Sequence, residues 1–275
     1  MSLVKLNNTE LDIEDSNPND KSMAMVWLHG LMFCMASDKE SGLFAWKKTA
    51  QQHRVVRYDA RGHGQSQVHA SEQDYHWPVL AKDAVAVVEH TEAEKVVLGG
   101  ASMGTATSLM AALDMIKNGQ QDKLAGLILV IPPTAWETRS GQARKYKLLA
   151  LLNKLKLVPR FLPKLVKGKV IPDVINKSLP YTEAVLRRYM ASHNPEVYQP
   201  LLTGAAESDL PSPDELKKID VPCLILAWVE DESHPVSTAR ILRDTLPNSE
   251  IHLANEPRHV DEWDREINDF LNTLK

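Results

Sequence analysis

Cysteine is scarce in this chain, with only Cys34 and Cys223 among 275 residues. The two lie far apart in the sequence and both border apolar segments, so neither a disulfide framework nor a cysteine metal site is indicated. No apolar run reaches the ~20 residues that a membrane-spanning helix needs. The first eight residues also lack the apolar stretch of a signal peptide. We therefore expect a cytoplasmic protein without stable membrane insertion.

The overall charge excludes one class of partner. A formal net charge of -4 provides no excess of basic groups, so nucleic-acid binding is not expected. The length of 275 residues suits one large α/β domain with an insertion, or two small domains.

Short apolar runs alternate along the chain with segments of helical pattern. Strands are predicted at residues 23–28, 54–59, 95–99, 124–131, 222–228 and 250–253. Helices are predicted at residues 43–52, 77–90, 105–116, 236–246 and 261–274. This alternation predicts an α/β fold whose mainly parallel sheet carries helices on both faces. Reactive groups are then expected in the loops after strands, at the carboxyl ends of the sheet.

One long segment interrupts the alternation. Residues 139–180 hold eleven Lys and Arg but a single acid, Asp173, which gives this stretch a net charge of +10. Three prolines divide it into short helices. We therefore predict a helical cap at residues 134–219, inserted into a core formed by residues 1–133 and 220–275.

The basic character of the predicted cap has three interpretations. In the first, its lysines line the solvated faces of amphipathic helices. In the second they attract an anionic substrate, and in the third they contact an anionic membrane surface. Three residues lie where the chain leaves the sheet for the cap and are candidates to line a substrate pocket, namely Trp136, Arg139 and Tyr146.

The sequence Gly100-Ala101-Ser102-Met103-Gly104 reads G-x-S-x-G between a predicted strand and a predicted helix. In that context the glycines leave room for the strand and the helix to pass each other closely. The serine at the centre of so sharp a turn has its hydroxyl exposed at the top of the sheet, beside the helix N-terminus. Ser102 is therefore the candidate nucleophile.

A serine nucleophile needs a base, and the base needs an acid to orient it. The loop after residues 222–228 offers three adjacent acids, of which Asp231, four residues before Pro235, is favoured by its spacing. The loop after the last predicted strand carries His259. The order Ser102, Asp231, His259 is the order of an α/β-hydrolase triad.

An acyl-transfer site also needs N–H groups that stabilise an oxyanion. We expect one from Met103, directly after the nucleophile at the helix N-terminus. We expect the second from Leu31, because Gly30 lets the chain turn after the first buried strand. His29 is interpreted as a structural hydrogen-bonding residue of that loop.

Taken together, these blocks resemble the α/β-hydrolase superfamily, in its branch of small capped esterases, lactonases and C–C bond hydrolases. The matching residues are His29-Gly30, residues 58–66 (Y-D-A-R-G-H-G-Q-S), Gly100–Gly104, Asp231 with Pro235, and His259. Residues 57–64 and 102–104 are also similar to 3-oxoadipate enol-lactonases. The chain departs from that pattern at Thr105, where glycine is common, and in the apolar loop at residues 30–34.

The resemblance implies a serine hydrolase that cleaves a small carboxylic ester or lactone through an acyl-enzyme, without a metal or cofactor. It leaves two questions open, namely whether the substrate is anionic and whether two copies of the chain form a homodimer. One alternative is a C–C bond hydrolase of carboxylated diketone ring-cleavage products. Another, from a different class, is a ligand-binding protein on a hydrolase fold that has lost its activity.

Overall fold

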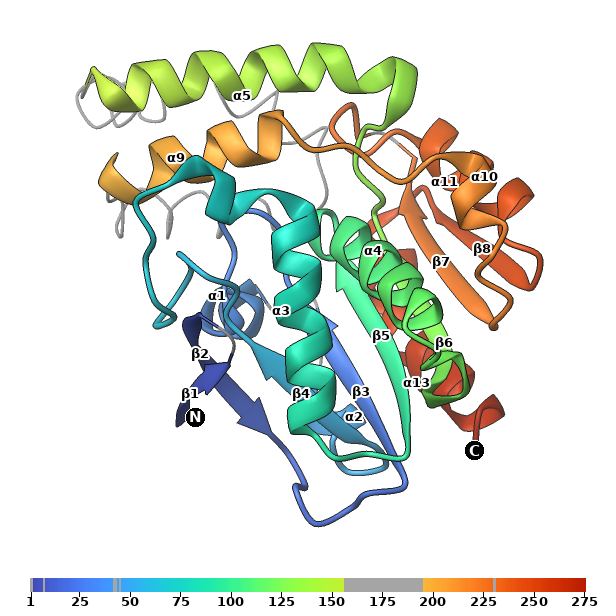
Figure 1. Cartoon of the computed structure of the whole chain (residues 1–275). Coiled ribbons are helices and arrows are strands. Elements are labelled where there is room, and N and C mark those ends of the chain that lie inside the picture. Colours follow the sequence, from blue (N-terminus) through green and yellow to red (C-terminus); the bar gives the residue numbers. More distant parts are fainter. Residues whose placement is uncertain (1, 7, 42–43, 45, 156–194, 230) are drawn as a thin grey trace.

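The computed structural model describes residues 2–6, 8–41, 44, 46–155, 195–229 and 231–275, and its centre is an eight-stranded sheet (Figure 1). The strands follow the order β1-β2-β4-β3-β5-β6-β7-β8 across the sheet. Their bounds are β1 Ser2–Leu6, β2 Thr9–Asp15, β3 Met23–Leu28, β4 Arg54–Tyr58, β5 Lys95–Ala101, β6 Leu124–Val130, β7 Cys223–Trp228 and β8 Ser249–Ala254. From β4 to β8 neighbouring strands pair in parallel, as the sequence predicts.

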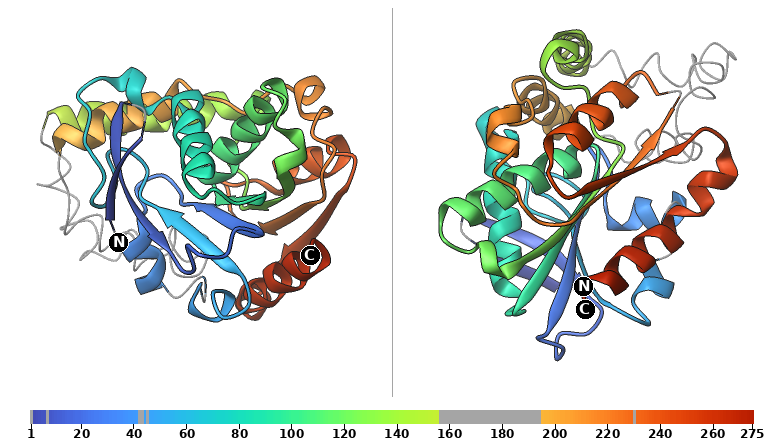
Figure 2. Two further views of the ribbon diagram at one scale, coloured as in Figure 1. Left: turned by 60° about the horizontal axis from the view of Figure 1, so that its bottom comes forward. Right: turned by 90° about the vertical axis from the view of Figure 1, so that its right-hand side faces the viewer.

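The two N-terminal strands were not predicted. β1 pairs antiparallel with β2, and β2 pairs antiparallel with β4, so they extend one edge of the parallel sheet. β1 is mostly exposed, so it lacks the continuous apolar run by which the buried strands are recognised. Figure 2 shows this pair at one side of the molecule, away from the C-terminal helix.

Helices cover both faces of the sheet, and each face has its own apolar core (Figure 2). The helices are α1 Met35–Ser41, α2 Trp46–Thr49, α3 Trp77–His90, α4 Met103–Lys117, α5 Arg139–Lys154, α9 Pro195–Ala206, α10 Pro213–Leu216, α11 Val236–Thr245, α12 Pro257–Asp261 and α13 Trp263–Thr273. Helices α3, α4 and α11 share one core, and α13 packs on the opposite face. Short 3-10 turns stand at Glu72–Tyr75, Gln121–Lys123 and Trp136–Thr138.

Helix α13 illustrates why the sequence folds onto this sheet. Its buried side chains are Trp263, Ile267, Phe270 and Leu271, which recur at the spacing of one helical face. They pack in one core with the apolar side chains of the central strands, including Ile128 of β6. Burial of such a face, at about 25 cal/mol for each Å² of apolar surface, is what holds the last helix in place.

Helices α5 and α9 lie side by side across the carboxyl-terminal ends of the parallel strands (Figure 1). They form most of the described part of the predicted cap, which also includes the 3-10 turn at Trp136–Thr138 and helix α10. Residues 156–194, which include the middle of the predicted cap and most of its basic segment, lie outside the described residues.

Helix α4 approaches the sheet closely at Gly104, in its first turn. A side chain there would collide with the backbone carbonyl of Leu28, the last residue of β3. A side chain at Gly100 would in turn collide with the backbone of Gly104. Both positions therefore require glycine because backbone contacts backbone there. This is the close passage of strand and helix that the sequence predicts.

We expect Gly104→Ala to lower the free energy of unfolding by about 3 kcal/mol or more, because neither backbone segment can move aside cheaply. Gly141→Ala is the matched control, since an added methyl group in helix α5 meets no atom within 4 Å. That variant should be neutral or more stable by about 0.5–1 kcal/mol through helix propensity. Urea unfolding of both variants measures the difference, and equal stabilities would contradict the close-contact explanation.

Candidate active site

Ser102 stands at the corner between β5 and α4 with strained backbone angles, φ 54° and ψ -109°. Its N–H donates to the carbonyl oxygen of Val130 on the next strand, at 3.0 Å. The hydroxyl of Thr105 lies 2.8 Å from the carbonyl oxygen of Gly100 and 2.9 Å from that of Val130. The threonine that departs from the family pattern therefore ties the helix start to both strands and stabilises the corner.

His234 lies between the serine and the acid. Its Nε2 is 2.7 Å from Ser102 Oγ, and its Nδ1 is 2.6 Å from a carboxylate oxygen of Asp231. A carboxylate only accepts hydrogen bonds, so Nδ1 carries the proton and Nε2 offers its lone pair to the serine hydroxyl. These two contacts give Ser102, His234 and Asp231 the arrangement of nucleophile, base and orienting acid.

Asp231 is buried and is oriented by the backbone of its own loop. One carboxylate oxygen accepts the N–H of Ser233 at 2.8 Å and that of His234 at 3.3 Å. Burial by itself would raise the pKa of this carboxyl, but the charge and hydrogen bond of His234 and the two backbone N–H groups outweigh it. The pKa of Asp231 is therefore below its ordinary value, and the group is an anion at neutral pH.

His259 is not where the sequence analysis expects it. Only Asn255 and Glu256 separate β8 from α12, so His259 lies within that short helix. Its Nδ1 accepts the N–H of Asn255 at 3.5 Å, which turns the ring toward its own loop. Among the described residues around the pocket, His234 and not His259 contacts Ser102. The structure therefore brings the histidine of the loop after β7 to the serine, and not the expected His259.

A local sequence signal pointed to this arrangement. Asp231 and His234 are three residues apart in one turn, closed by a 3.2 Å hydrogen bond from the N–H of His234 to the carbonyl oxygen of Asp231. Three residues is the spacing at which side chains in a turn can meet. The family order, in which the histidine follows the last strand, predicts His259 instead.

Leu31, a predicted oxyanion donor, sits in a tight turn beside Ser102. The turn is closed by a 3.0 Å hydrogen bond from the N–H of Phe33 to the carbonyl oxygen of Gly30. Met32 occupies the left-handed region at φ 66°, which is uncommon for a residue with a side chain. Its N–H donates to Nε2 of His63 at 3.2 Å, and this bond offsets part of the strain and fixes the turn.

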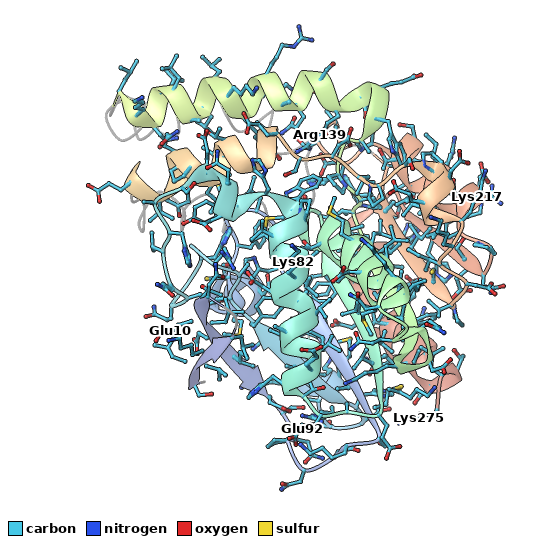
Figure 3. The ribbon with its side chains drawn as sticks, viewed as in Figure 1. Glu10, Lys82, Glu92, Arg139, Lys217 and Lys275 are labelled. Carbon is cyan, nitrogen blue, oxygen red and sulfur yellow. The ribbon has the colours of Figure 1, made fainter. Side chains whose placement is uncertain are left out.

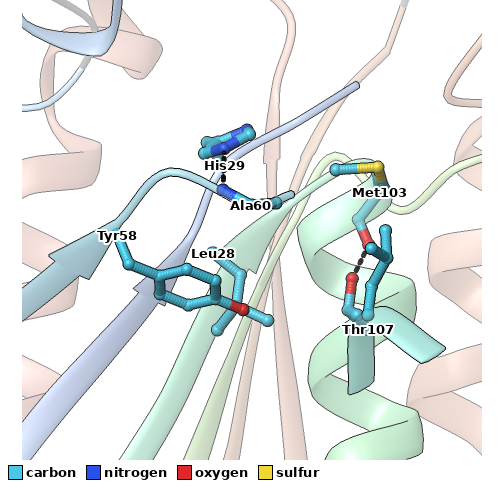
Figure 4. Close-up of a pocket in the computed structure, with 7 residues that line it drawn as sticks. Leu28, His29, Tyr58, Ala60, Met103 and Thr107 are labelled. Atoms are coloured by element: carbon cyan, nitrogen blue, oxygen red, sulfur yellow. Dashed lines mark hydrogen bonds between the residues drawn. The ribbon is translucent and has the colours of Figure 1, made fainter. Parts of the chain in front are cut away.

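Two buried histidines, His29 and His63, hold this turn in place by hydrogen bonds. Nδ1 of His29 lies 2.8 Å from the carbonyl oxygen of Gly30, and its Nε2 accepts the N–H of Ala60 at 2.9 Å (Figure 4). Nδ1 of His63 lies 3.0 Å from the carbonyl oxygen of Arg61. Each ring therefore donates at one nitrogen and accepts at the other, which requires the neutral form. Burial, with the neighbouring His29, lowers the pKa of His63 to about 3.

Residues 59–66 hold the loop in place through hydrogen bonds and one buried ion pair. Asp59 accepts the N–H groups of Met35 at 2.7 Å and of Gln65 at 3.0 Å. Arg61 forms a paired contact with Asp83, with both nitrogen–oxygen distances at 2.7 Å and both side chains almost fully buried. Paired contacts of this geometry fix both side chains rigidly.

A cavity of about 250 Å³ opens above Ser102. Its described lining is mostly apolar, with polar groups from helices α1 and α5 and from the loops that carry Ser102 and His234. The lining residues are Gly30, Leu31, Met32, Phe33, Asp38, Phe44, Ala101, Ser102, Ile131, Gln142, Tyr146, Asp231, Ser233 and His234. Tyr146 lies in the pocket as predicted, and its phenol hydrogen-bonds with Gln142.

The other two predicted pocket residues have structural contacts instead. The indole N–H of Trp136 donates to the carbonyl oxygen of Pro211 at 3.1 Å. Arg139 is the first residue of helix α5, at the end labelled in Figure 3, and it is buried. Its guanidinium stacks 4.4 Å above the ring of Trp77 and donates to the carbonyl oxygens of Ser208, at 2.7 Å, and Ala205. Neither residue is among the described lining of the pocket.

Within the described part of the chain, no three His, Cys, Asp or Glu side chains are grouped closely enough to hold a metal ion. None of the described helices is long and apolar enough to cross a bilayer.

Comparison with known proteins agrees with this architecture. The family model described as the alpha/beta hydrolase fold matches residues 24–157, from β3 to the end of α5. The chain has the α/β-hydrolase fold. Its mainly parallel sheet with helices on both faces, and its serine corner between β5 and α4, are those that the sequence predicts.

The chain is similar in sequence to 3-oxoadipate enol-lactonase 2 of Acinetobacter baylyi, with 24% identity over 75% of this chain and 72% of the relative. A thermophilic esterase from Thermogutta terrifontis superimposes with a TM-score of 0.73 at 23% identity, over 100% of this chain and 99% of the other. The enol-lactonase from Burkholderia xenovorans LB400 gives 0.68 at 19% identity, over 98% and 100%. At these identities the two structures establish the fold.

The neutral state of His63 predicts an acid-sensitive stability. The unfolded chain binds a proton on this ring near pH 6.5, whereas the folded chain binds it only near pH 3. The stability that neutral His63 contributes is therefore complete above pH 6.5 and is lost as the pH falls from 6.5 toward 3.

Replacement of this ring should make the pH dependence shallower. His63→Gln keeps an acceptor for Met32 but removes the titration, so the slope of unfolding free energy between pH 6 and 4 should fall by one proton, about 1.4 kcal/mol per pH unit. His90→Gln, at an exposed position, is the control and should keep the original slope. Urea unfolding across this pH range measures the slopes, and an unchanged slope in His63→Gln would contradict a neutral His63.

Proposed function

We propose that this chain is a serine hydrolase that cleaves a small carboxylic ester or lactone through an acyl-enzyme. The observation that carries the proposal is the continuous hydrogen-bonded chain from Ser102 through His234 to Asp231, at 2.7 and 2.6 Å. A ligand-binding protein has no need of a serine hydroxyl bonded to an oriented imidazole. The similarity to an enol-lactonase and to esterases supports the same class of substrate.

In the proposed mechanism, Ser102 Oγ attacks the ester carbonyl carbon while His234 Nε2 takes the hydroxyl proton. The carbonyl oxygen becomes an oxyanion, stabilised by the N–H groups of Leu31 and Met103. The bond from carbon to the leaving oxygen then breaks, and His234 returns its proton to that oxygen. His234 next deprotonates a water molecule, which attacks the acyl-enzyme, releases the acid and restores the serine.

Asp231 has an electrostatic role in both steps. As an anion it accepts the Nδ1 proton, so the imidazole keeps the tautomer in which Nε2 is free to take a proton from the serine. Once Nε2 is protonated, the imidazolium lies 2.6 Å from a carboxylate in a largely buried loop, which stabilises the charged form.

Substitution of the nucleophile tests the reaction class. Ser102→Ala should lower kcat/KM for p-nitrophenyl butyrate by at least about 10⁴-fold, because no other group can form the acyl-enzyme. A fluorophosphonate probe should label the unaltered protein at Ser102, as located by peptide mass spectrometry, and leave the variant unlabelled. Retained hydrolysis in the variant would exclude the serine mechanism. Cleavage of a carboxylated 1,3-diketone but of no ester would favour a C–C bond hydrolase.

A pair of histidine variants tests which base is used. His234→Ala should lower kcat by about 10³-fold or more, since the nucleophile loses its proton acceptor. His259→Ala is the matched control, and we expect it to stay within about twofold of the original activity. The thermal midpoints of both variants, followed by circular dichroism, separate catalysis from folding. The reverse pattern of activities would return the base to the loop after β8.

A further inference from the structure

A second carboxyl group, besides that of Asp231, lines the pocket. Asp38 belongs to helix α1, far in sequence from the loop that carries Asp231 and His234, and its residue is only 5% exposed. The proposed mechanism does not use it. The described lining of the same pocket also includes the apolar residues Phe33 and Phe44.

The surroundings of Asp38 fix its position. One carboxylate oxygen accepts the indole N–H of Trp27 at 3.2 Å. That indole is held in turn by the rings of Phe44 and Trp46, whose centres lie 4.7 and 4.6 Å from it. Burial raises the pKa of Asp38 to about 7, against the lowering effects of Trp27 and Arg57. A carboxyl group held this rigidly cannot turn away from a bound substrate.

The described lining includes no cationic side chain that could offset a second negative charge on a substrate. Arg139, the cap cation expected near the substrate, is stacked on Trp77 and bonded to backbone carbonyl oxygens instead. The described lining thus includes two acidic residues, Asp38 and Asp231, and no lysine or arginine.

We propose that Asp38 is a specificity-determining residue, which makes the pocket select uncharged esters over esters that carry a carboxylate. The proposal rests on the proposed hydrolase function of the same pocket. A substrate carboxylate would lose its water and approach two carboxyl groups, so it would bind only with repulsion or with uptake of a proton. This conclusion is opposite to the one that the basic cap suggests when its charge is considered alone.

Three esters of equal length test the proposal on the full chain. They are p-nitrophenyl hexanoate, the mono-p-nitrophenyl ester of adipic acid, and the p-nitrophenyl ester of 6-aminohexanoic acid. They share a leaving group and end in a methyl group, a carboxylate and an ammonium group, respectively. Comparison of the two charged esters cancels the loss of apolar contact that either charge causes. We expect kcat/KM to be at least about tenfold lower for the anionic ester than for the cationic one.

Asp38→Asn should reduce that ratio by at least about fivefold, mainly through faster cleavage of the anionic ester. Asparagine keeps an acceptor oxygen for Trp27, so the wall should stay intact. Glu137→Gln removes one negative charge from an exposed position near the cap and should leave the ratio unchanged. If Asp38→Asn does not fold, the ratio of kcat/KM for the two charged esters in the original protein still tests whether the pocket disfavours a substrate carboxylate.

Equal rates for the two charged esters, or a ratio that Asp38→Asn changes no more than Glu137→Gln does, would overturn the role of Asp38. If that happens while hexanoate is still cleaved in a Ser102-dependent reaction, the proposed function stands and only the inference about Asp38 fails. If none of the three esters is cleaved, or if Ser102→Ala cleaves them equally well, the proposed function itself fails.

Discussion

The backbone contact between Gly104 and Leu28 is the constraint on which the site depends. It lets the start of α4 touch the end of β3, so the strained corner at Ser102 lies directly beside the loop that begins at His29. Gly30 continues this contact, because a Cβ there would lie 3.7 Å from that of Ser102. The proposed nucleophile and the proposed oxyanion donor are thus brought together by packing of backbone against backbone, which leaves little room for movement.

The proposed acid and the proposed base lie in one loop, so the fold needs fewer long-range contacts to assemble the site. Asp231 and His234 meet within a single turn after β7, so their 2.6 Å contact is formed by local geometry. Only one long-range contact is then needed, between His234 and Ser102. The sheet provides it through β6, which pairs with β5 on one side and with β7 on the other.

Charge along the sequence and charge around the pocket differ in this protein. The segment at residues 139–180 is strongly basic, yet its first cation, Arg139, is used to join the cap to Trp77 and to backbone carbonyl oxygens. The described pocket wall instead presents two carboxyl groups. A net charge counts side chains wherever they point, whereas a substrate meets only those that face it.

The sequence by itself determined the parallel sheet, the helices on both faces and the corner at Ser102, because each depends on local pattern: apolar runs, helical spacing and glycine. It also placed Asp231 in the loop after a buried strand. Only the tertiary structure decided that His234 and not His259 reaches Ser102, and that Asp38 faces the same pocket. Those outcomes depend on the length of the loop after β8 and on contacts between residues far apart in the chain, which no local pattern records.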